Sequence, residues 1–190
     1  MRLKEFNSFY LVGGTALALK FGHRISVDLD LFSNENFDTA NIVNVLQKEF
    51  SGDFYMENQN PKWGIFCFIE EIKVDIIHYK HPIIHQPDTI EGIRLYSSPD
   101  ITAMKINAIL GRGKKKDFWD LAELLQHYKL AEMISFHNKK YPSQNLLITI
   151  PQAITYFDDA EESEDPVSLK NQTWDSVKKT IQKSVREYLS

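Results

Sequence analysis

Apolar and polar residues alternate along residues 25–32, which is the period of a β-strand with one buried face. The apolar side of this alternation holds Ile25, Val27, Leu29 and Leu31. The polar side holds Asp28 and Asp30, so the pattern predicts two carboxylates on one face of a strand. Residues 72–79 also have a strand pattern, in which Asp75 is a carboxylate among strongly apolar neighbours.

Short apolar runs predict the remaining strands. Segments in which apolar residues recur at helical spacing, with capping residues at their starts, predict the helices. Strands are expected at residues 8–12, 54–57, 64–69 and 93–96, and helices at residues 15–21, 36–50, 98–111, 116–128, 131–140 and 171–189. Asp38 or Thr39 is expected to cap the second helix, and Ser98 is expected to cap the third. Residues 93–96 are expected to form an edge strand, and residues 158–166 are expected to form an exposed loop. This order predicts an α+β fold of the α/β type, in which a mixed β-sheet with flanking helices is followed by a helical region. We expect the sheet in residues 1–97 and the helical region in residues 98–190.

A glycine pair, Gly13-Gly14, ends the first predicted strand and opens the first predicted helix. Glycines allow the backbone to approach a phosphate closely, and the N–H groups at a helix N-terminus bind anions. Gly13 and Gly14, together with Thr15, are therefore candidates for a phosphate cradle. A plain strand-to-helix turn is the alternative. Thirteen residues separate Gly14 from Asp28, and the nearby pair of aspartates favours the phosphate-binding interpretation.

The three aspartates are candidate ligands for a divalent cation, because Mg²⁺ prefers oxygen ligands such as carboxylates. Asp28 and Asp30 would hold Mg²⁺, or Mn²⁺ in its place. Asp75 would complete the metal site or take the proton of an attacking hydroxyl. The alternatives are a solvated strand face for Asp28 and Asp30, and a salt bridge to a nearby lysine for Asp75. An unpaired charge on an apolar strand is unfavourable, which supports a cation or another partner beside Asp75.

Composition narrows the range of partners. The 190 residues are 43% hydrophobic and 25% charged, as in an ordinary globular protein with a proper core. The net charge of −4 argues against a broad basic surface for nucleic acid. Arg112 and the run Lys114-Lys115-Lys116 could still meet an RNA backbone, or could simply be solvated. The single Cys67 permits no internal disulfide, and no signal sequence or bilayer-spanning run is visible, so we expect a cytoplasmic protein.

Two parts of the chain resemble the nucleotidyltransferase AbiEii/AbiGii toxin family, which belongs to the wider nucleotidyltransferase superfamily. The first part, residues 11–19 and 23–32, carries the glycine pair and the Asp-x-Asp motif. Asp75 matches the later aspartate of the superfamily pattern. The second part, residues 104–112 and 116–121, is similar to a helical family segment with Lys-x-x-Ala, an arginine and Asp-x-x-Asp.

The resemblance implies a nucleotidyltransferase fold and roles for residues outside the glycine and aspartate motifs. Arg24 and Lys105 would contact the phosphates of a nucleoside triphosphate, and Lys105 would also take part in catalysis. Lys116, Asp117 and Asp120 would lie near the nucleotide or pin their helix to the site. The alternative for Asp117 and Asp120 is a place on the helix surface or in a structural salt bridge. The C-terminal helical region would complete the nucleotide site.

The resemblance also implies an activity. The expected enzyme is a Mg²⁺-dependent nucleotidyltransferase that moves a nucleoside monophosphate to RNA, in particular to the 3′ end of tRNA. It would be the toxin of a bacterial toxin–antitoxin or phage-defence pair, with a cognate antitoxin protein. The alternatives are transfer to a small molecule or protein, and a non-catalytic interaction protein that retains the fold. Only twelve residues precede Gly13, where many relatives have a longer helical lead. The irregular spacing of His78, His81 and His85 argues against a zinc site.

Overall fold

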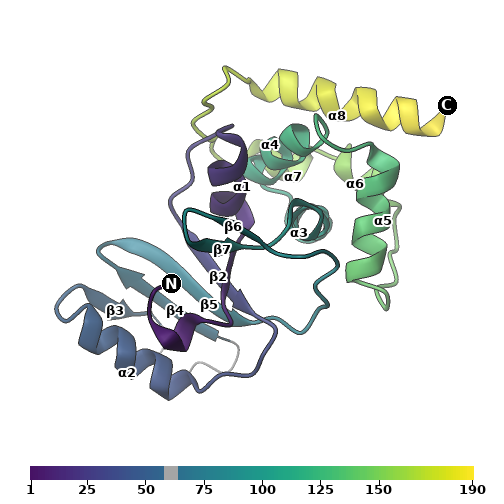
Figure 1. The fold of residues 1–190 in the computed structure, drawn as a ribbon. Coiled ribbons are helices and arrows are strands. Elements are labelled where there is room, and N and C mark those ends of the chain that lie inside the picture. The colour runs from purple at the N-terminus through teal and green to yellow at the C-terminus, as the bar shows by residue number, and fades with distance from the viewer. Residues whose placement is uncertain (58–63) are drawn as a thin grey trace. The chain divides into compact units, whose positions relative to one another are not determined.

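A computed structural model describes residues 1–57 and 64–190 of the chain (Figure 1). The chain divides into two compact units. Unit 1 comprises Met1–Ala16 and Ser26–Tyr96, and unit 2 comprises Leu17–Ile25 and Ser97–Ser190. Helix α1 (Gly13–Phe21) therefore begins in unit 1 and ends in unit 2.

The described residues of unit 1 form one mixed sheet of seven strands in the order β3-β4-β5-β2-β1-β7-β6. The strands are β1 (Tyr10–Val12), β2 (Leu29–Ser33), β3 (Phe54–Met56), β4 (Gly64–Ile69), β5 (Ile72–His78), β6 (Asp88–Ile90) and β7 (Ile93–Leu95), and the 3₁₀ helix η1 (Lys4–Phe6) precedes them. Strand β2 lies between its antiparallel partner β1 and its parallel partner β5. This central position of β2 confirms that the sheet is mixed and places the Asp-x-Asp segment near its middle.

The core of unit 1 lies between one face of the sheet and helix α2 (Thr39–Glu49). Ile42 and Leu46 of this helix belong to the same buried cluster as Val74 and Ile76 of β5. Successive side chains of a strand point to opposite faces, so the residues between these two core positions lie on the other face of the sheet. The alternation predicted for residues 72–79 is therefore confirmed.

The helix starts depend on side chains that accept a backbone hydrogen bond. Asp38 caps α2 by accepting a bond from the N–H of Asn41 at 3.1 Å, as the sequence predicts. Helix α3 (Ser98–Gly111) is capped by Ser97, whose hydroxyl accepts a bond from the N–H of Asp100 at 3.2 Å. The prediction that Ser98 is the cap was wrong by one residue, because Ser97 is the last residue with an extended backbone.

The helices of unit 2 pack around α3, which contacts α4, α5 and α6 (Figure 1). The further helices are α4 (Lys115–Leu124), α5 (Leu130–Lys140), α6 (Ile150–Ile154), α7 (Asp158–Glu161) and α8 (Trp174–Leu189). Trp174 of α8 stacks on Trp119 of α4, with the ring centroids 5.7 Å apart, and lies edge-on against Phe118 and Phe157. This aromatic cluster gives unit 2 a hydrophobic core of its own.

The strand predicted over residues 25–32 is shorter than expected, because it begins only at Leu29. Arg24 forms an isolated β-bridge with Ser168, and the N–H of Ile25 donates to the carbonyl of Val167 at 2.9 Å. The start of the predicted strand therefore pairs with a distant part of unit 2 and does not extend β2.

Two further predictions were wrong. Residues 93–96 are not at the edge of the sheet, because β7 pairs with both β1 and β6. The turn between β6 and β7 has positive φ at Glu91 and Gly92, and β6 is too short to show a clear alternation in the sequence. Residues 158–166 are not entirely an exposed loop, because they begin with α7, in which Ala160 is buried.

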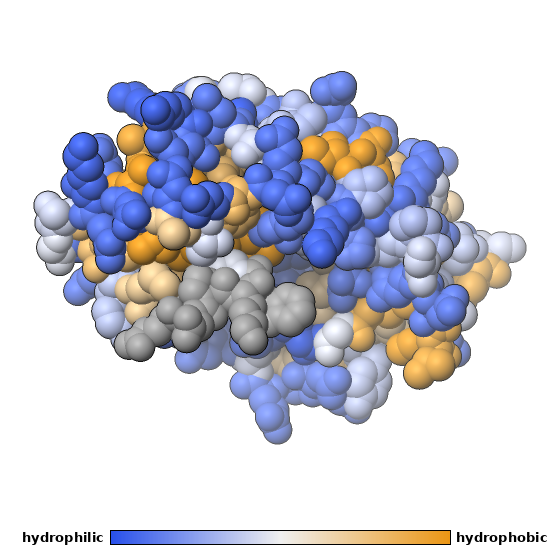
Figure 2. Space-filling view, turned by 90° about the horizontal axis from the view of Figure 1, so that it is seen from below, coloured by the Kyte–Doolittle hydropathy of each residue, from blue (hydrophilic) through white to orange (hydrophobic). Residues whose placement is uncertain are grey.

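Polar side chains predominate on the face drawn in Figure 2, and apolar side chains gather there in separate patches. Cys67 is buried in β4. Burial, together with the negative charge of Asp75, raises the pKa of the Cys67 thiol to about 11, so the thiol is protonated and unreactive at neutral pH. Among the described helices, none combines the length and the apolar character needed to cross a bilayer.

Two isoleucines of β5 test how strongly the sheet depends on its helix-covered face. Ile76 is fully buried, whereas Ile72 is 40% exposed on the same face of the same strand. We expect Ile76→Ala to lower the free energy of unfolding by about 2–5 kcal/mol, because it leaves a cavity in the core. Ile72→Ala should lower it by about 1 kcal/mol or less. Urea unfolding measures both values, and equal losses would contradict this account of the core.

Candidate active site

Asp30 and Asp75 are direct neighbours across the sheet. They are Cα partners in the parallel pair of β2 and β5, so both side chains lie on the same face. This face is opposite the α2 core, because Asp75 alternates with buried residues. Asp28 precedes β2 by one residue and lies two residues before Asp30. The fold therefore brings Asp30 and Asp75 together on one sheet face, with Asp28 directly before the start of β2.

Gly13 lies against the Asp30 carboxylate at the point where β1 ends and α1 begins. Val12 is the Cα partner of Asp30, so the next residue starts the helix beside that carboxylate. Gly13 has a φ of 71°, and a Cβ atom added to it would overlap Oδ2 of Asp30. The position therefore requires glycine both for its backbone conformation and for this close approach.

Thr15 holds the segment that leads into β2. Its hydroxyl makes a short hydrogen bond to the backbone carbonyl of Asp28 and lies 3.0 Å from the hydroxyl of Ser26. A carbonyl only accepts, so Thr15 donates its single proton to Asp28, and the Ser26 hydroxyl is left to donate to Thr15. In this structure Thr15 thus positions the Asp28 segment. Its predicted contact with a phosphate stays a prediction.

Lys73 lies beside the carboxylates. Its Nζ is 3.0 Å from Oδ2 of Asp75, so the lysine salt bridge that the sequence left open for Asp75 is present. Burial acts to lower the pKa of Lys73, but the hydrogen bond to Asp75 and the negative charges of Asp75, Asp28 and Asp30 outweigh it and raise that pKa. The charges of all three aspartates therefore act on one ammonium group.

The carboxylates suit a divalent cation in their chemistry. Oδ1 of Asp75 is buried and has no hydrogen-bond partner among the described residues. A buried carboxylate oxygen without a partner is costly, and a cation would satisfy it. Within residues 1–57 and 64–190, no three acidic, histidine or cysteine side chains converge as they do around a bound metal. Binding by Asp28, Asp30 and Asp75 would therefore require their side chains to turn toward the ion.

Unit 2 contains a second group of predicted residues, centred on the fully buried Asp120. Arg24 donates to both of its oxygens, from Nε to Oδ1 at 2.7 Å and from Nη2 to Oδ2 at 2.9 Å. Nε2 of His23 lies 2.7 Å from Oδ1, and Nζ of Lys105 lies 2.6 Å from Oδ2. Three residues from two separate parts of the sequence thus meet at one carboxylate.

Asp117 adds a second negative charge to this cluster. Its Oδ1 accepts a hydrogen bond from Nζ of Lys105 at 2.9 Å, and its Oδ2 lies 3.9 Å from Nε of the exposed Arg112. Burial acts to lower the pKa of Lys105, but Asp120 and Asp117 outweigh it and raise that pKa. Burial acts to raise the pKa of Asp120, but Lys105, His23 and Arg24 hold it well below its usual range. Lys105 and Asp120 are therefore both ionised at neutral pH.

The remaining predicted basic residues lie at the start of α4. Lys116 is half-buried, and Lys114 is exposed. Lys115 is bound to Asp165 at 2.8 Å, and its Nζ lies 5.8 Å from the centre of the Trp174 ring. One member of the predicted RNA-facing run is thus engaged within unit 2.

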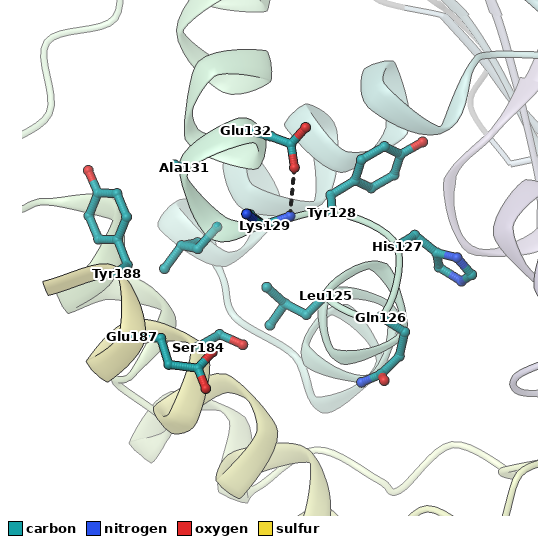
Figure 3. A pocket seen from close by; sticks show the side chains of 11 residues that line it. Leu125, Gln126, His127, Tyr128, Lys129, Ala131, Glu132, Ser184, Glu187 and Tyr188 are labelled. Carbon is teal, nitrogen blue, oxygen red and sulfur yellow. Dashed lines mark hydrogen bonds between the residues drawn. The ribbon is translucent and has the colours of Figure 1, made fainter. Parts of the chain in front are cut away.

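A pocket of about 800 Å³ in unit 2 contains none of the predicted site residues (Figure 3). It lies between the segment that joins α4 to α5 and the C-terminal half of α8. Its polar lining includes His127, Glu132 and Glu187. A smaller pocket of about 410 Å³ lies between α6 and the end of α8. Neither pocket contributes to the carboxylate site.

Comparison with known proteins gives the family. Residues 1–187 match the profile of the family described as "Nucleotidyl transferase AbiEii toxin, Type IV TA system", in which TA stands for toxin–antitoxin. The chain belongs to the AbiEii nucleotidyltransferase toxin family. An uncharacterized protein of Aquifex aeolicus, aq_aa25, is 32% identical over 191 residues, which cover 96% of this chain and 89% of that protein.

Solved structures give the fold of this AbiEii-family chain. A protein from H. pylori described as a nucleotidyltransferase matches with a TM-score of 0.59 at 17% identity, over 96% of this chain and 89% of that one. The nucleotidyltransferase toxin MenT4 of Mycobacterium tuberculosis matches with a TM-score of 0.58 at 14% identity, over 95% and 76%. The mixed sheet with flanking helices is thus a nucleotidyltransferase fold, and the family makes the protein a nucleotidyltransferase.

Two residues that contact predicted site residues in this AbiEii-family chain, one in each unit, were not singled out from the sequence. Lys73 lies two residues before Asp75 in the same strand, so the strand period could have placed both on one face. His23 is adjacent to Arg24, but its partner Asp120 is 97 positions away, and no local pattern reveals that contact.

Alanine substitutions test whether the close approach of Gly13 to Asp30 is needed. Gly92 is the control position, because it also has a positive φ but has open space around it. Gly13→Ala and Gly92→Ala should each lower the free energy of unfolding by about 1–2 kcal/mol, because alanine disfavours this backbone conformation. Only Gly13→Ala also displaces the Asp30 carboxylate, and it should lower nucleotide transfer by about a hundredfold. Incorporation of an α-labelled nucleotide measures this effect. Equal activity of the two variants would show that the close approach is unnecessary.

Removal of the Asp120 carboxylate should strongly destabilise unit 2. Asp120→Ala removes the carboxylate that the buried Arg24 and Lys105 both bind, and we expect a loss of about 3–5 kcal/mol. The exposed Asp159 is the matched control, and Asp159→Ala should change stability by about 0.5 kcal/mol or less. Urea unfolding followed by the fluorescence of the stacked Trp119 and Trp174 reports on this unit. Similar losses in the two variants would mean that the cluster is not a stabilising element.

Proposed function

We propose that this nucleotidyltransferase uses Mg²⁺, or Mn²⁺ in its place, to transfer a nucleoside monophosphate from a nucleoside triphosphate to RNA. The observation that carries the proposal is the pairing of Asp30 with Asp75 on one sheet face, with Oδ1 of Asp75 buried and without a partner among the described residues. Asp28, Asp30 and Asp75 would hold the metal ion. When bound, the ion would neutralise the triphosphate and favour attack at the α-phosphorus.

The chain supplies the proton acceptor and the phosphate-binding groups of the proposed reaction. Asp75 would take the proton of the acceptor hydroxyl through the carboxylate oxygen that does not bind the metal. The hydroxyl oxygen then forms a bond to the α-phosphorus, the bond from that phosphorus to the bridging oxygen breaks, and pyrophosphate leaves. Gly13, Gly14 and Thr15 would bind phosphate oxygens at the start of α1, where backbone N–H groups are not used within the helix.

In unit 2, we assign nucleotide binding to Arg24, Lys105, Lys116, Asp117 and Asp120. Family membership supports this assignment, because the residues lie in the two segments that resemble the family. Arg24 and Lys105 would contribute positive charge toward phosphates, and the charge developed in the transition state would be stabilised by Lys105. Asp117 and Asp120 would hold both cations in position, as they hold them in this structure.

The proposed acceptor is the 3′ end of tRNA, and the proposed role is that of a toxin in a bacterial toxin–antitoxin or phage-defence pair. The family description and the nucleotidyltransferase toxin MenT4 support this role. A cognate antitoxin protein would then be a partner, and the proposed substrates place the activity in the cytoplasm. The net charge of −4 favours a second candidate, transfer to a small molecule or protein, because such acceptors need no basic surface.

A labelling experiment tests the proposal. The full chain is incubated with Mg²⁺, each α-labelled nucleoside triphosphate in turn, and total bacterial tRNA. We expect label in tRNA from at least one nucleotide, and Asp30→Asn should reduce it by at least about a hundredfold. Asp53→Asn, which changes an exposed aspartate of unit 1 by the same atoms, should retain full activity.

Each other outcome has a defined meaning. Label that is unchanged in Asp30→Asn would contradict the metal site. Label that requires Asp30 but appears in protein or in a small molecule added instead of tRNA would favour the second candidate. No label with any acceptor would leave a protein that retains the fold without this activity.

A further inference from the structure

Lys73 is a cation of unit 1 that directly contacts one of the proposed metal ligands, Asp75. Strand β5 places it two residues before Asp75, on the same face. Its ammonium group lies 3.0 Å from Oδ2 of Asp75, while Oδ1 of the same carboxylate has no described partner. One oxygen of Asp75 is therefore occupied by a cation of the chain itself.

The strand register brings this contact beside a second carboxylate. Asp30 is the Cα partner of Asp75 on the same sheet face, and Asp28 lies two residues before Asp30. Three negative charges gathered on one face repel one another unless a cation lies among them. Lys73 contributes positive charge beside them through its contact with Asp75.

Lys73 differs from the buried lysines of the chain in its freedom to leave. Its side chain is 39% exposed, so the ammonium can move into water without a large loss of hydration. Lys105 is buried and lies 2.6 Å from Asp120, and Lys140 is buried and lies 2.7 Å from Asp100. Breaking either contact would separate a buried charge from its counter-charge, which is costly. The contact of Lys73 with its carboxylate is thus exchangeable, whereas the contacts of Lys105 and Lys140 are permanent.

We propose that Lys73 is a built-in counter-cation that competes with the divalent metal for the Asp28, Asp30 and Asp75 carboxylates. The inference rests on the proposed function, because it assumes that these aspartates bind the metal. In the metal-free protein the ammonium neutralises part of the carboxylate charge and stabilises unit 1. When the metal binds, like charges repel, and Lys73 releases Oδ2 of Asp75 and moves into solvent. Lys73 therefore lowers metal affinity and stabilises the metal-free state.

Mn²⁺ binding to the full, metal-free chain tests this competition without any need for activity. The amount of free Mn²⁺ is followed by electron paramagnetic resonance as the ion is titrated into each protein. Lys73→Met and Lys73→Gln remove the charge and should bind Mn²⁺ about three- to tenfold more tightly, because a repelling charge is gone. Lys73→Arg keeps the charge and should retain the wild-type affinity. Lys48→Met removes an exposed charge of α2 and controls for net charge.

Thermal unfolding provides an independent measurement on the same proteins. In the presence of a chelator, Lys73→Met should unfold at a lower temperature than the wild type, because the carboxylates have lost their counter-cation. Added Mn²⁺ should raise the unfolding temperature of Lys73→Met by more than that of the wild type, as tighter binding to the folded state requires. Lys48→Met should respond to Mn²⁺ as the wild type does.

The outcomes separate the two proposals. If the wild type binds Mn²⁺ and both neutral variants bind it more tightly, Lys73 is a competing counter-cation. If the wild type binds Mn²⁺ and the neutral variants bind it equally or more weakly, the competition is overturned while the metal site stands. If neither the wild type nor any variant binds Mn²⁺, the proposed metal site falls and the role of Lys73 falls with it.

Discussion

The register between β2 and β5 is the constraint on which the proposed active site depends. A parallel pairing that aligns residue 30 with residue 75 places two carboxylates side by side on one face of the sheet. Like charges at this distance repel, so the arrangement is stable only with positive charge nearby. Lys73 supplies such charge in this structure, and Gly13 leaves room for the Asp30 carboxylate where α1 begins.

Unit 2 has the opposite arrangement, in which a carboxylate is surrounded by cations. Asp120 is buried and binds Arg24, His23 and Lys105 directly. Buried charges are tolerated only when they are closely paired, so these contacts fix the segment that carries Arg24 against α3 and α4. This explains why Leu17–Ile25 belongs to unit 2 although the strands of unit 1 separate it in sequence from the other helices.

Nucleotidyl transfer requires little covalent chemistry from the protein, since the triphosphate already carries the leaving group. The protein must place carboxylates, backbone N–H groups and cations, and hold them there. In the proposed site, backbone features such as strand register and the start of a helix would do this. The solved structures named above have this fold at only 17% and 14% sequence identity to this chain.

The sequence by itself determined the features that depend on local periodicity. The alternation around Asp75, the glycine pair before a helix and the cap at Asp38 each involve residues within a few positions of one another. Only the tertiary structure decided which strands are neighbours, why β2 begins at Leu29, and that His23 meets Asp120 across 97 positions. The physical reason is that periodicity records which face of an element is buried, whereas strand pairing and ion pairs are decided by contacts between distant parts of the chain.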